Sequence, residues 1–481
     1  MNYNSSLSLQ YFDIETLLRD LPRGERWLRH LKEDLLPFWT MPSALGNPLG
    51  NFPTYRNNDG SLVNPNDLRP EFQHLVPGIV WLDREHVRAK SRQCFAYGVA
   101  YHMTGNEEYL VYAKAGVAFL REYAFDRVNG GAYSYFTQPE IIPGPDVPFR
   151  TSQDLAYLLA GIGFLYYLTR DPELEKELVE THDYIWFNYY DSGADMFRWV
   201  LEDSPEGDKK NQNEIVAQLD QIYGYMMLVT PCLPEPHQST WKEHLVKLAH
   251  ILMDRFYSPR TEMFWGAVTN TKVKSWGTPH TDFGHSVKTF WLISLIGSLT
   301  DNYEMFVSAQ RRASQILDLA YLEGSGSWAR RLKPDGNLDE DKEWWIHCEL
   351  DQVAGALALN DPAYLRYIVR TYDYWFKYMV DHQNHEIWPM LSGATNQPVE
   401  GFPKQHSWKN ALHSFEHALI GYLFAQQLHD EPATLYFAWQ ETPPRRQIAP
   451  YFYQATVQEI SESPTKEQGK KLQKVLFTTI H

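Results

Sequence analysis

Turn signals recur along this chain at a nearly constant spacing, and this spacing constrains the fold more than any other feature of the sequence. Each turn follows an apolar helical stretch and precedes an amphipathic one, such as residues 109–123 and 364–380. The interval is about 60 to 65 residues, and the turns begin at Thr104, Thr169, Pro234, Thr300 and Asn360. A unit of two helices cannot bury its apolar face alone, so successive units must pack against one another.

Short aromatic stretches follow the second helix of each unit and predict brief strands or hairpins. They lie at residues 131–136, 195–199, 262–265, 327–328 and 386–388. An opening helix at about 25–39 and a closing helix at about 408–427 bring the expected total to about twelve helices. Such units stack either into an open superhelix or into a closed ring. Because an open array needs polar capping repeats and both terminal helices here are apolar, we predict a closed, all-α ring.

The length of 481 residues would by itself favour two domains, but repeat rings are an exception to that rule. The repeat pattern predicts one domain over residues 1–430. Beyond it the composition changes, with two prolines at 443–444, a β-prone run at 451–453 and a charged end at 466–474. We predict that residues 431–481 form a C-terminal appendage packed on the ring, and a separate small domain is the alternative.

The composition excludes several classes of partner. A net charge of −16 argues against nucleic acid and anionic membranes, which require basic surfaces. Cys94, Cys232 and Cys348 are too few for a disulfide framework and lack the spacing of a zinc site. The first residues carry no signal-peptide pattern, and the longest apolar run, 155–168, is too short to span a bilayer. We therefore expect a cytoplasmic protein without a membrane partner, and self-association is left open.

One polar side chain per repeat recurs on the apolar helices at the period of the repeat itself. The steps are about 62 to 67 residues, and the series comprises Arg92, Asp154, Gln218, His285, Glu349 and His413. Side chains at one phase of a ring should point toward a common central cavity. The alternative is that long helices carry occasional polar residues by chance, and it weighs most heavily on Asp154 and Gln218.

Two histidines of this series occupy equivalent positions near the starts of their helices. His285 is followed three residues later by Lys288, and His413 by Glu416 at the same spacing. A single histidine on an apolar helix is usually a hydrogen-bonded core residue, but two at equivalent points favour a functional role. Histidine titrates near neutral pH, so two facing imidazoles could take a proton from one face of a carbon and return one on the other.

Several motifs together resemble one known superfamily. The matching stretches lie, in order, at residues 28–39, 51–62, 91–93, 284–288, 342–349 and 408–413. Their order and spacing resemble the N-acylglucosamine 2-epimerase superfamily, which includes cellobiose 2-epimerases and aldose–ketose isomerases. The resemblance spans about residues 25–428 and implies an (α/α)6 barrel, a toroid of about twelve helices.

The resemblance also implies roles for individual residues. His285 and His413 would be the acid/base pair, and Arg92 would bind the oxygens at C1 and C2 of a sugar. A proton next to the carbonyl would be removed to give a cis-enediol without a cofactor or metal, and the arginine would stabilise the developing negative oxygen. By the same resemblance Trp345 and Glu349 would help to hold the sugar. The polar series and its neighbours add further candidate sugar contacts: Asp154, Gln218, Lys288, Trp408 and Glu416. Epimerases and isomerases share this intermediate, so the sequence leaves the choice between them open.

Three positions depart from the pattern of that superfamily. Lys288 stands where a glutamate is frequent, Glu416 where an arginine is frequent, and Gln218 where a histidine is frequent. The first two changes together invert a charge pair between neighbouring helices while keeping the sum of its charges. A solvated loop is the expected place for His280 and Asp282, which precede the first catalytic candidate, and a position lining the pocket mouth is the alternative.

Two other functions remain open at this level. A glycoside hydrolase or lyase on the same ring would use inward carboxylates, for which Asp154 and Glu349 are the candidates. A non-catalytic saccharide binder is the other alternative, in which Lys288 and Gln218 mark a decayed site. In all three readings the partner is a small sugar or saccharide.

Overall fold

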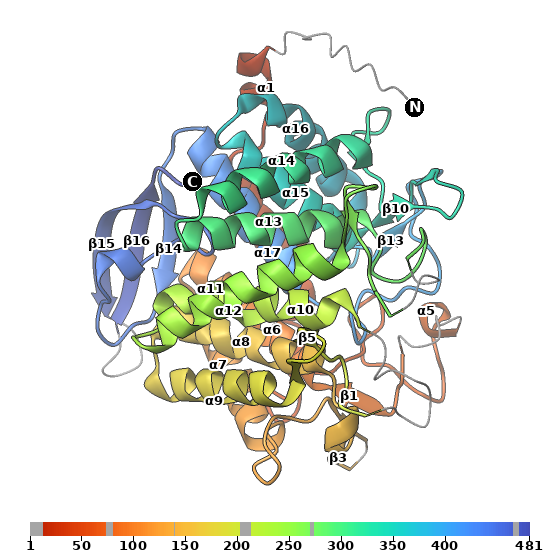
Figure 1. Cartoon of the computed structure of the whole chain (residues 1–481), viewed down its shortest axis with the longest axis vertical. Helices are drawn as coiled ribbons and strands as arrows, with labels where there is room; N and C mark the ends of the chain where they lie inside the picture. The colour runs from red at the N-terminus through yellow and green to blue at the C-terminus, as the bar shows by residue number, and fades with distance from the viewer. Residues whose placement is uncertain (1–12, 74–79, 139, 203–212, 270–273, 465–470) are drawn as a thin grey trace.

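The inner wall of the fold is a ring of helices whose residues are buried on nearly every side (Figure 1). The computed structural model describes residues 13–73, 80–138, 140–202, 213–269, 274–464 and 471–481. Within these residues the wall consists of α6 (Val87–Thr104), α8 (Ser152–Thr169), α10 (Ile215–Gln221) with η3 (Ile222–Met226) and α11 (Met227–Val229), α13 (Phe283–Leu299), α15 (Trp344–Ala358) and α17 (Leu412–Leu428). Each packs against the next, and α17 contacts α6, which closes the ring.

A second layer of amphipathic helices covers this wall on the outside. It comprises α2 (Gly24–Arg29) with η1 (His30–Leu35) and α3 (Leu36–Trp39), α7 (Glu107–Tyr123), α9 (Pro172–Tyr189), α12 (His237–Ile251) with η5 (Leu252–Phe256), α14 (Tyr303–Ala320), and α16 (Leu365–Tyr374) with η7 (Trp375–Met379). Asn106, Asp171 and Asn302 cap the N-termini of α7, α9 and α14 with their side chains. The turn signals in the sequence are therefore the points where outer helices start.

Short antiparallel strand pairs lie in the loops that lead from outer to inner helices, at four of the five predicted aromatic stretches; at 386–388 the structure has an isolated bridge between Val380 and Ile387 instead. The hairpins are β4 (Tyr190–Asp191) with β5 (Met196–Phe197), β6 (Tyr257–Ser258) with β7 (Met263–Phe264), and β8 (Tyr321–Leu322) with β9 (Ser327–Trp328). The other pairings join β1 (Arg84–His86), β2 (Tyr135–Thr137) and β3 (Ile142–Gly144) in one sheet, β10 (Arg331–Leu332) to β11 (Leu338–Asp339), and β12 (Lys342–Glu343) to β13 (Met390–Leu391). Short helical pieces complete the loops: α1 (Ile14–Asp20), α4 (Pro42–Leu45), α5 (Pro70–Gln73), η2 (Val147–Phe149), η4 (Thr230–Cys232), η6 (Pro362–Tyr364) and η8 (Arg445–Gln447).

This arrangement confirms the predicted (α/α)6 barrel. The closing helix begins at Leu412 rather than at about 408, because the side chain of Asn410 accepts a hydrogen bond from the Leu412 N–H (3.0 Å) and forms a turn before it. Among the described residues, no helix is both long and apolar enough to cross a bilayer. The N-terminal residues considered for a signal peptide lie outside the described residues.

The C-terminal residues form a three-stranded antiparallel sheet at one end of the ring (Figure 1). Its strands lie in the order β14 (Ala433–Phe437), β16 (Lys471–Thr478) and β15 (Thr456–Pro464). β14 lies against the ends of α6 and α8, where the Tyr101 hydroxyl donates to the carbonyl of Phe437 (2.8 Å). The N–H of Ala438 donates in turn to the carbonyl of Leu168 (2.9 Å). These bonds tie the sheet to the inner wall.

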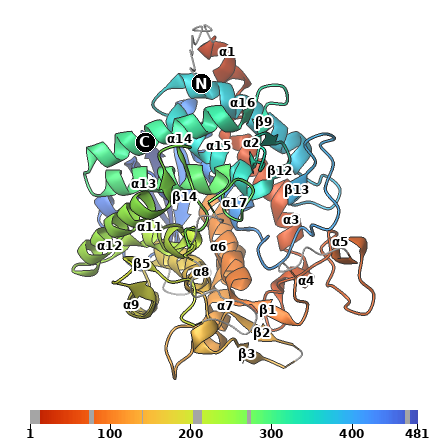
Figure 2. The ribbon, with the colours of Figure 1, turned by 45° about the vertical axis from the view of Figure 1, so that its right-hand side comes forward.

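The inner helices share one direction, so the ring has two different mouths. Each inner helix starts after a loop that carries short strands and ends at a turn near the other mouth; in Figure 2 the side with β12 and β13 comes toward the viewer. A cavity of about 320 Å³ is lined by N-terminal turns of the inner helices. A second cavity of about 480 Å³ lies among the C-terminal turns of α13 and α15 and the segment 445–455.

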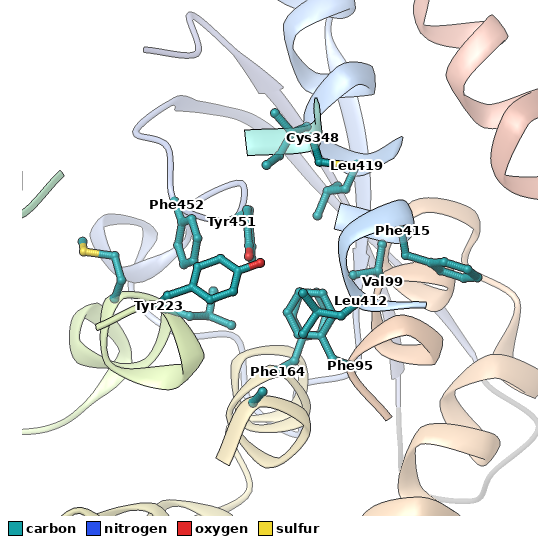
Figure 3. Packing of buried hydrophobic residues seen from close by; sticks show 14 of the residues in the cluster. Phe95, Val99, Phe164, Tyr223, Cys348, Leu412, Phe415, Leu419, Tyr451 and Phe452 are labelled. Atoms are coloured by element: carbon teal, nitrogen blue, oxygen red, sulfur yellow. The ribbon is translucent and has the colours of Figure 1, made fainter. Parts of the chain in front are cut away.

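Aromatic side chains from different segments fill the axis of the ring between these cavities (Figure 3). The rings of Phe95 and Phe164 meet edge to face with centroids 4.5 Å apart. Tyr451 comes from the segment between β14 and β15, stacks on Phe452 (3.8 Å between centroids) and also contacts Phe164. The C-terminal segment therefore enters the core of the ring.

Gly421 lets α17 approach α2 closely, because a Cβ at that position would lie 2.4 Å from the buried indole of Trp27. Replacing Gly421 by Ala should lower stability by about 1–3 kcal/mol, despite the better helix propensity of alanine. The midpoint of urea unfolding measures this loss. Gly324→Ala is the matched control, since a Cβ there would meet nothing within 4 Å among the described residues. An equal loss in both variants would contradict the packing argument.

Candidate active site

The cavity at the N-terminal mouth collects chemistry-bearing side chains from all six inner helices. Its wall includes Arg92 from α6, Tyr157 from α8, Asp220 from α10, His285 and Lys288 from α13, Trp345 from α15 and His413 from α17. Its volume of about 320 Å³ lies at the small end of the range for ligand pockets. Within the described residues, no group of three or more His, Cys, Asp or Glu side chains is arranged to hold a metal ion.

Asp282 fixes the orientation of His285. As the N-cap of α13, its Oδ1 accepts the backbone N–H of His285 (2.7 Å), and its Oδ2 lies 2.7 Å from Nδ1 of the same residue. Burial would raise the pKa of Asp282, but the imidazole and the backbone donor hold it below its usual range. Because Nδ1 faces a carboxylate, it carries the proton, which leaves Nε2 to accept one.

The loop before His285 is part of the cavity rather than a solvated loop, which corrects the expectation for His280 and Asp282. Both residues line the cavity, and Asp282 is buried. The His280 ring lies 5.0 Å from the ring of His285, edge to face, and its Nδ1 lies 3.2 Å from a carboxylate oxygen of Glu214. The signal that identifies Asp282 is its position three residues before His285, which is the distance from an N-cap to the backbone N–H that it binds.

His413 lies across the cavity in a more enclosed position. Its Nδ1 lies 3.2 Å from the hydroxyl of Tyr223, and 3.7 and 3.8 Å from carboxylate oxygens of Glu416 and Glu349. Burial lowers the pKa of His413 to about 4, so the ring is neutral at pH 7 and can act as a base. Trp345 packs against both imidazoles, with centroid distances of 4.7 Å to His285 and 6.2 Å to His413.

Arg92 presents its guanidinium to the same cavity. One nitrogen donates to the carbonyl of Trp408 (3.0 Å), and the group lies 3.6 Å above the ring of Tyr157. Its Nε has no hydrogen-bond partner among the described residues. A guanidinium held by stacking, with donors to spare, suits an oxygen that carries negative charge.

Beneath the cavity floor lies a cluster of buried charges. Lys288 Nζ lies 3.2 Å from Glu349 Oε1 and also 3.2 Å from the centroid of the Tyr223 ring. Burial would lower the pKa of Lys288, but Glu349 and other acidic neighbours raise it, so the lysine stays charged. Burial also raises the pKa of Glu349. The direct partner of Lys288 is therefore Glu349, while Glu416 is held by hydroxyl groups.

The structure gathers most of the predicted site residues. Of the predicted residues, six line the cavity: Arg92, His285, Lys288, Trp345, Trp408 and His413. Glu349 and Glu416 lie directly behind His413.

Asp154 and Gln218 do not belong to the cavity wall. Asp154 accepts a hydrogen bond from Arg88 (2.6 Å), and the amide of Gln218 binds the backbone N–H and carbonyl of Phe197, both at 2.8 Å. Gln218 thus anchors β5. Asp220, two residues further along α10, faces the cavity in its place.

Sequence reasoning missed several residues of the wall, because they lie outside the series with one polar side chain per repeat. They are Gln153, Tyr157, Asp220, Arg331, Glu343, Trp344 and His406. Tyr223 was also missed, and it lies in a π-helical turn within an inner helix, a distortion that is frequent at functional sites.

Replacing Lys288 by Met should leave Glu349 buried without its cation. We expect a loss of about 3–5 kcal/mol at pH 8, because an uncompensated buried charge is costly. The loss should be smaller at pH 5: burial raises the pKa of Glu349, so the folded variant keeps the carboxyl protonated there, and stability falls as the pH rises through that raised pKa. Urea unfolding at both pH values measures this.

The double variant Lys288→Met/Glu349→Gln removes both charges and is the control. It should regain most of the stability and lose the added pH dependence. A single variant as stable as the parent at pH 8 would show that the ion pair does not hold the charge of Glu349.

Comparison with known proteins gives a consistent assignment. No family model matches this chain. It is 22% identical over 350 residues to the cellobiose 2-epimerase of Eubacterium cellulosolvens, and the match covers 68% of this chain and 80% of that protein. A sugar epimerase from a ruminal bacterium has the same fold with a TM-score of 0.68, at 16% identity, over 84% of this chain and 98% of the other. A D-mannose isomerase matches with a TM-score of 0.64, at 16% identity, over 86% and 99%. This chain is therefore similar in sequence to a cellobiose 2-epimerase and shares its barrel with solved structures of the N-acylglucosamine 2-epimerase-like superfamily.

Proposed function

We propose that this protein is a sugar epimerase or aldose–ketose isomerase that acts at C1 and C2 of a free reducing sugar without a cofactor. Relatives named cellobiose 2-epimerase and D-mannose isomerase support this class of reaction. The observation that carries the proposal is the cavity wall, on which two imidazoles and one guanidinium meet. Each imidazole has its Nδ1 turned toward acidic or hydroxyl groups of the protein.

The first step is removal of the proton at C2 of the open-chain sugar. The neutral ring of His413 takes this proton on Nε2, and the electron pair of the C–H bond moves toward the carbonyl oxygen at C1. Arg92 receives the negative charge that develops on that oxygen. The product of the step is a cis-enediolate, the ionised form of the cis-enediol, with its negative oxygen bound to the guanidinium.

The second step returns a proton to the intermediate. His285 in its protonated form, oriented by Asp282, donates to C2 from the opposite face, and the carbonyl forms again at C1 to give the epimer. Proton delivery to C1 instead, with the proton of the C2 hydroxyl passing to the C1 oxygen, moves the carbonyl to C2 and gives the ketose. The imidazoles then exchange protons with solvent through the open mouth, so solvent hydrogen enters the product.

Incubation with free sugars in D2O tests the proposal and separates its two forms. Deuterium at C2 of an aldose whose C2 configuration has changed would indicate an epimerase, and deuterium at C1 of a ketose an isomerase. NMR follows both positions, and the panel should include aldoses, ketoses and β-1,4-linked disaccharides. No exchange into any free sugar would exclude both forms.

Substitution of either imidazole should abolish this exchange. We expect His285→Asn and His413→Asn each to lower the rate at least about 10³-fold, since each removes a proton-transferring group. His250→Asn is the control, because His250 is exposed on an outer helix. Parental rates in either active-site variant would contradict the assignment.

The hydrolase alternative has less support in this geometry. Asp154, one of its two carboxylates, is paired with Arg88 at 2.6 Å, and Glu349, the other, is paired with Lys288 at 3.2 Å. An inverting hydrolase needs two carboxyl groups facing each other across the substrate. Release of new reducing ends from a glycoside, without exchange into free sugars, would favour it.

A further inference from the structure

Tyr451 reaches the axis of the ring from outside the repeats. Its backbone N–H donates to the hydroxyl of Tyr167 on α8 (3.0 Å), and that hydroxyl donates to the carbonyl of Ala449 (2.6 Å). The residue adopts a left-handed conformation, with φ of 62°. One hydroxyl of α8 therefore binds the backbone on both sides of Pro450. The backbone conformation there directs the Tyr451 side chain inward (Figure 3).

The hydroxyl of Tyr451 ends on a buried carboxylate of the charged cluster. It donates to Glu416 Oε1 at 2.5 Å, and the other oxygen of Glu416 accepts the hydroxyl of Tyr223. Figure 3 shows the two hydroxyls side by side at the centre of the ring. Glu416 is 2% exposed, so these two donors replace the water that the carboxylate loses on burial.

Tyr451 stands between the two cavities. Its side chain lines the far cavity of about 480 Å³ and is not part of the wall of the active-site cavity. It therefore does not touch a sugar bound beside His285 and His413. Any effect of Tyr451 on the reaction has to pass through Glu416, whose Oε2 lies 3.7 Å from Nδ1 of His413.

We propose that Tyr451 is a positioning residue of the active site, which holds Glu416 ionised and so sets the protonation and tautomer of His413. The inference rests on the function proposed above. The Tyr223 hydroxyl donates its hydrogen bond to the Glu416 carboxylate. The Tyr223 oxygen can therefore accept a hydrogen bond from Nδ1 of His413. With its proton on Nδ1, His413 presents the lone pair of Nε2 to the cavity as the base.

The charged and titratable groups around the His413–Glu416 pair come from the inner helices that face it. They are Arg92 on α6, Asp220 on α10, Tyr223 on η3, Lys288 on α13 and Glu349 on α15, together with Tyr451. Burial opposes the charge of Glu416, but His413 and the two hydroxyls hold its pKa below the usual value. Removing the Tyr451 hydroxyl therefore destabilises the ionised form of Glu416, and this carboxyl binds its proton at a higher pH.

Tyr451→Phe tests this directly in the full-length protein, because it removes the hydroxyl and keeps the ring. NMR of histidine labelled with 15N follows the titration of His413, whose signals are assigned by their loss in His413→Asn. We expect the titration midpoint of His413 to fall by about one pH unit or more, because a protonated Glu416 no longer stabilises the imidazolium. Tyr453→Phe is the matched control, since Tyr453 is equally buried two residues away and its hydroxyl makes no described bond to Glu416. It should leave the midpoint unchanged.

Activity provides a second readout. In Tyr451→Phe, kcat should fall about tenfold or more, KM should change less than twofold, and the acid limb of the kcat profile should move to higher pH. Loss of kcat and of thermal stability with an unchanged acid limb and an unchanged His413 titration would reduce Tyr451 to a structural role and overturn the proposal.

The two readouts separate this inference from the proposed function. The absence of exchange into any sugar would refute the proposed function. The NMR titration needs no turnover, so it would still test the role of Tyr451. If Tyr451→Phe does not fold, Glu416→Gln replaces it. That variant removes the carboxylate and should lower the His413 midpoint, and an unchanged midpoint would show that Glu416 is not ionised beside His413.

Discussion

Charged side chains at the centre of an apolar ring are stable only where each is compensated in place, and this constraint governs the site. Lys288 stays charged because Glu349 lies 3.2 Å away, and Glu416 because two hydroxyls bind it. The same surroundings keep His413 neutral at pH 7. A lysine could not serve as a base here while it is charged, so the proposed reaction assigns proton transfer to the imidazoles and assigns to the charged cluster behind His413 the control of its protonation.

The barrel brings these groups together by the direction of its helices. All inner helices start at one mouth, so residues in the first two turns of α6, α13 and α17 face one another although more than a hundred residues separate one from the next in the sequence. The two histidines are held at the starts of their helices: Asp282 caps α13 and orients His285, and the Asx turn at Asn410 ends just before His413. The rigid part of the site is thus a property of helix starts, whereas the hairpins and loops shape the rim.

The period of the turn signals was sufficient to predict the number of helical hairpins and the helices that carry the site, and the apolar terminal helices predicted the closure of the ring. The period was not sufficient to predict which side of each inner helix faces the cavity. Sequence distance counts loop residues as well as helical ones, so a constant step of about 64 residues does not ensure the same rotation about each helix axis. His285 and His413 face the cavity, but on α8 and α10 the wall is made by Tyr157 and Asp220 instead of Asp154 and Gln218. Tyr451 follows no period at all, because its position depends on the path of an irregular segment.

The C-terminal segment lies outside the six helical hairpins that form the ring. A ring of six hairpins can close by contact of α17 with α6 alone, and a later segment is then free to occupy the far end of the axis. Here that segment supplies an aromatic stack and a hydroxyl for Glu416, a residue of the closing helix. An anionic residue at this position and a hydroxyl donor beneath it form one unit, since a buried carboxylate without donors would bind a proton and lose its influence on the adjacent imidazole.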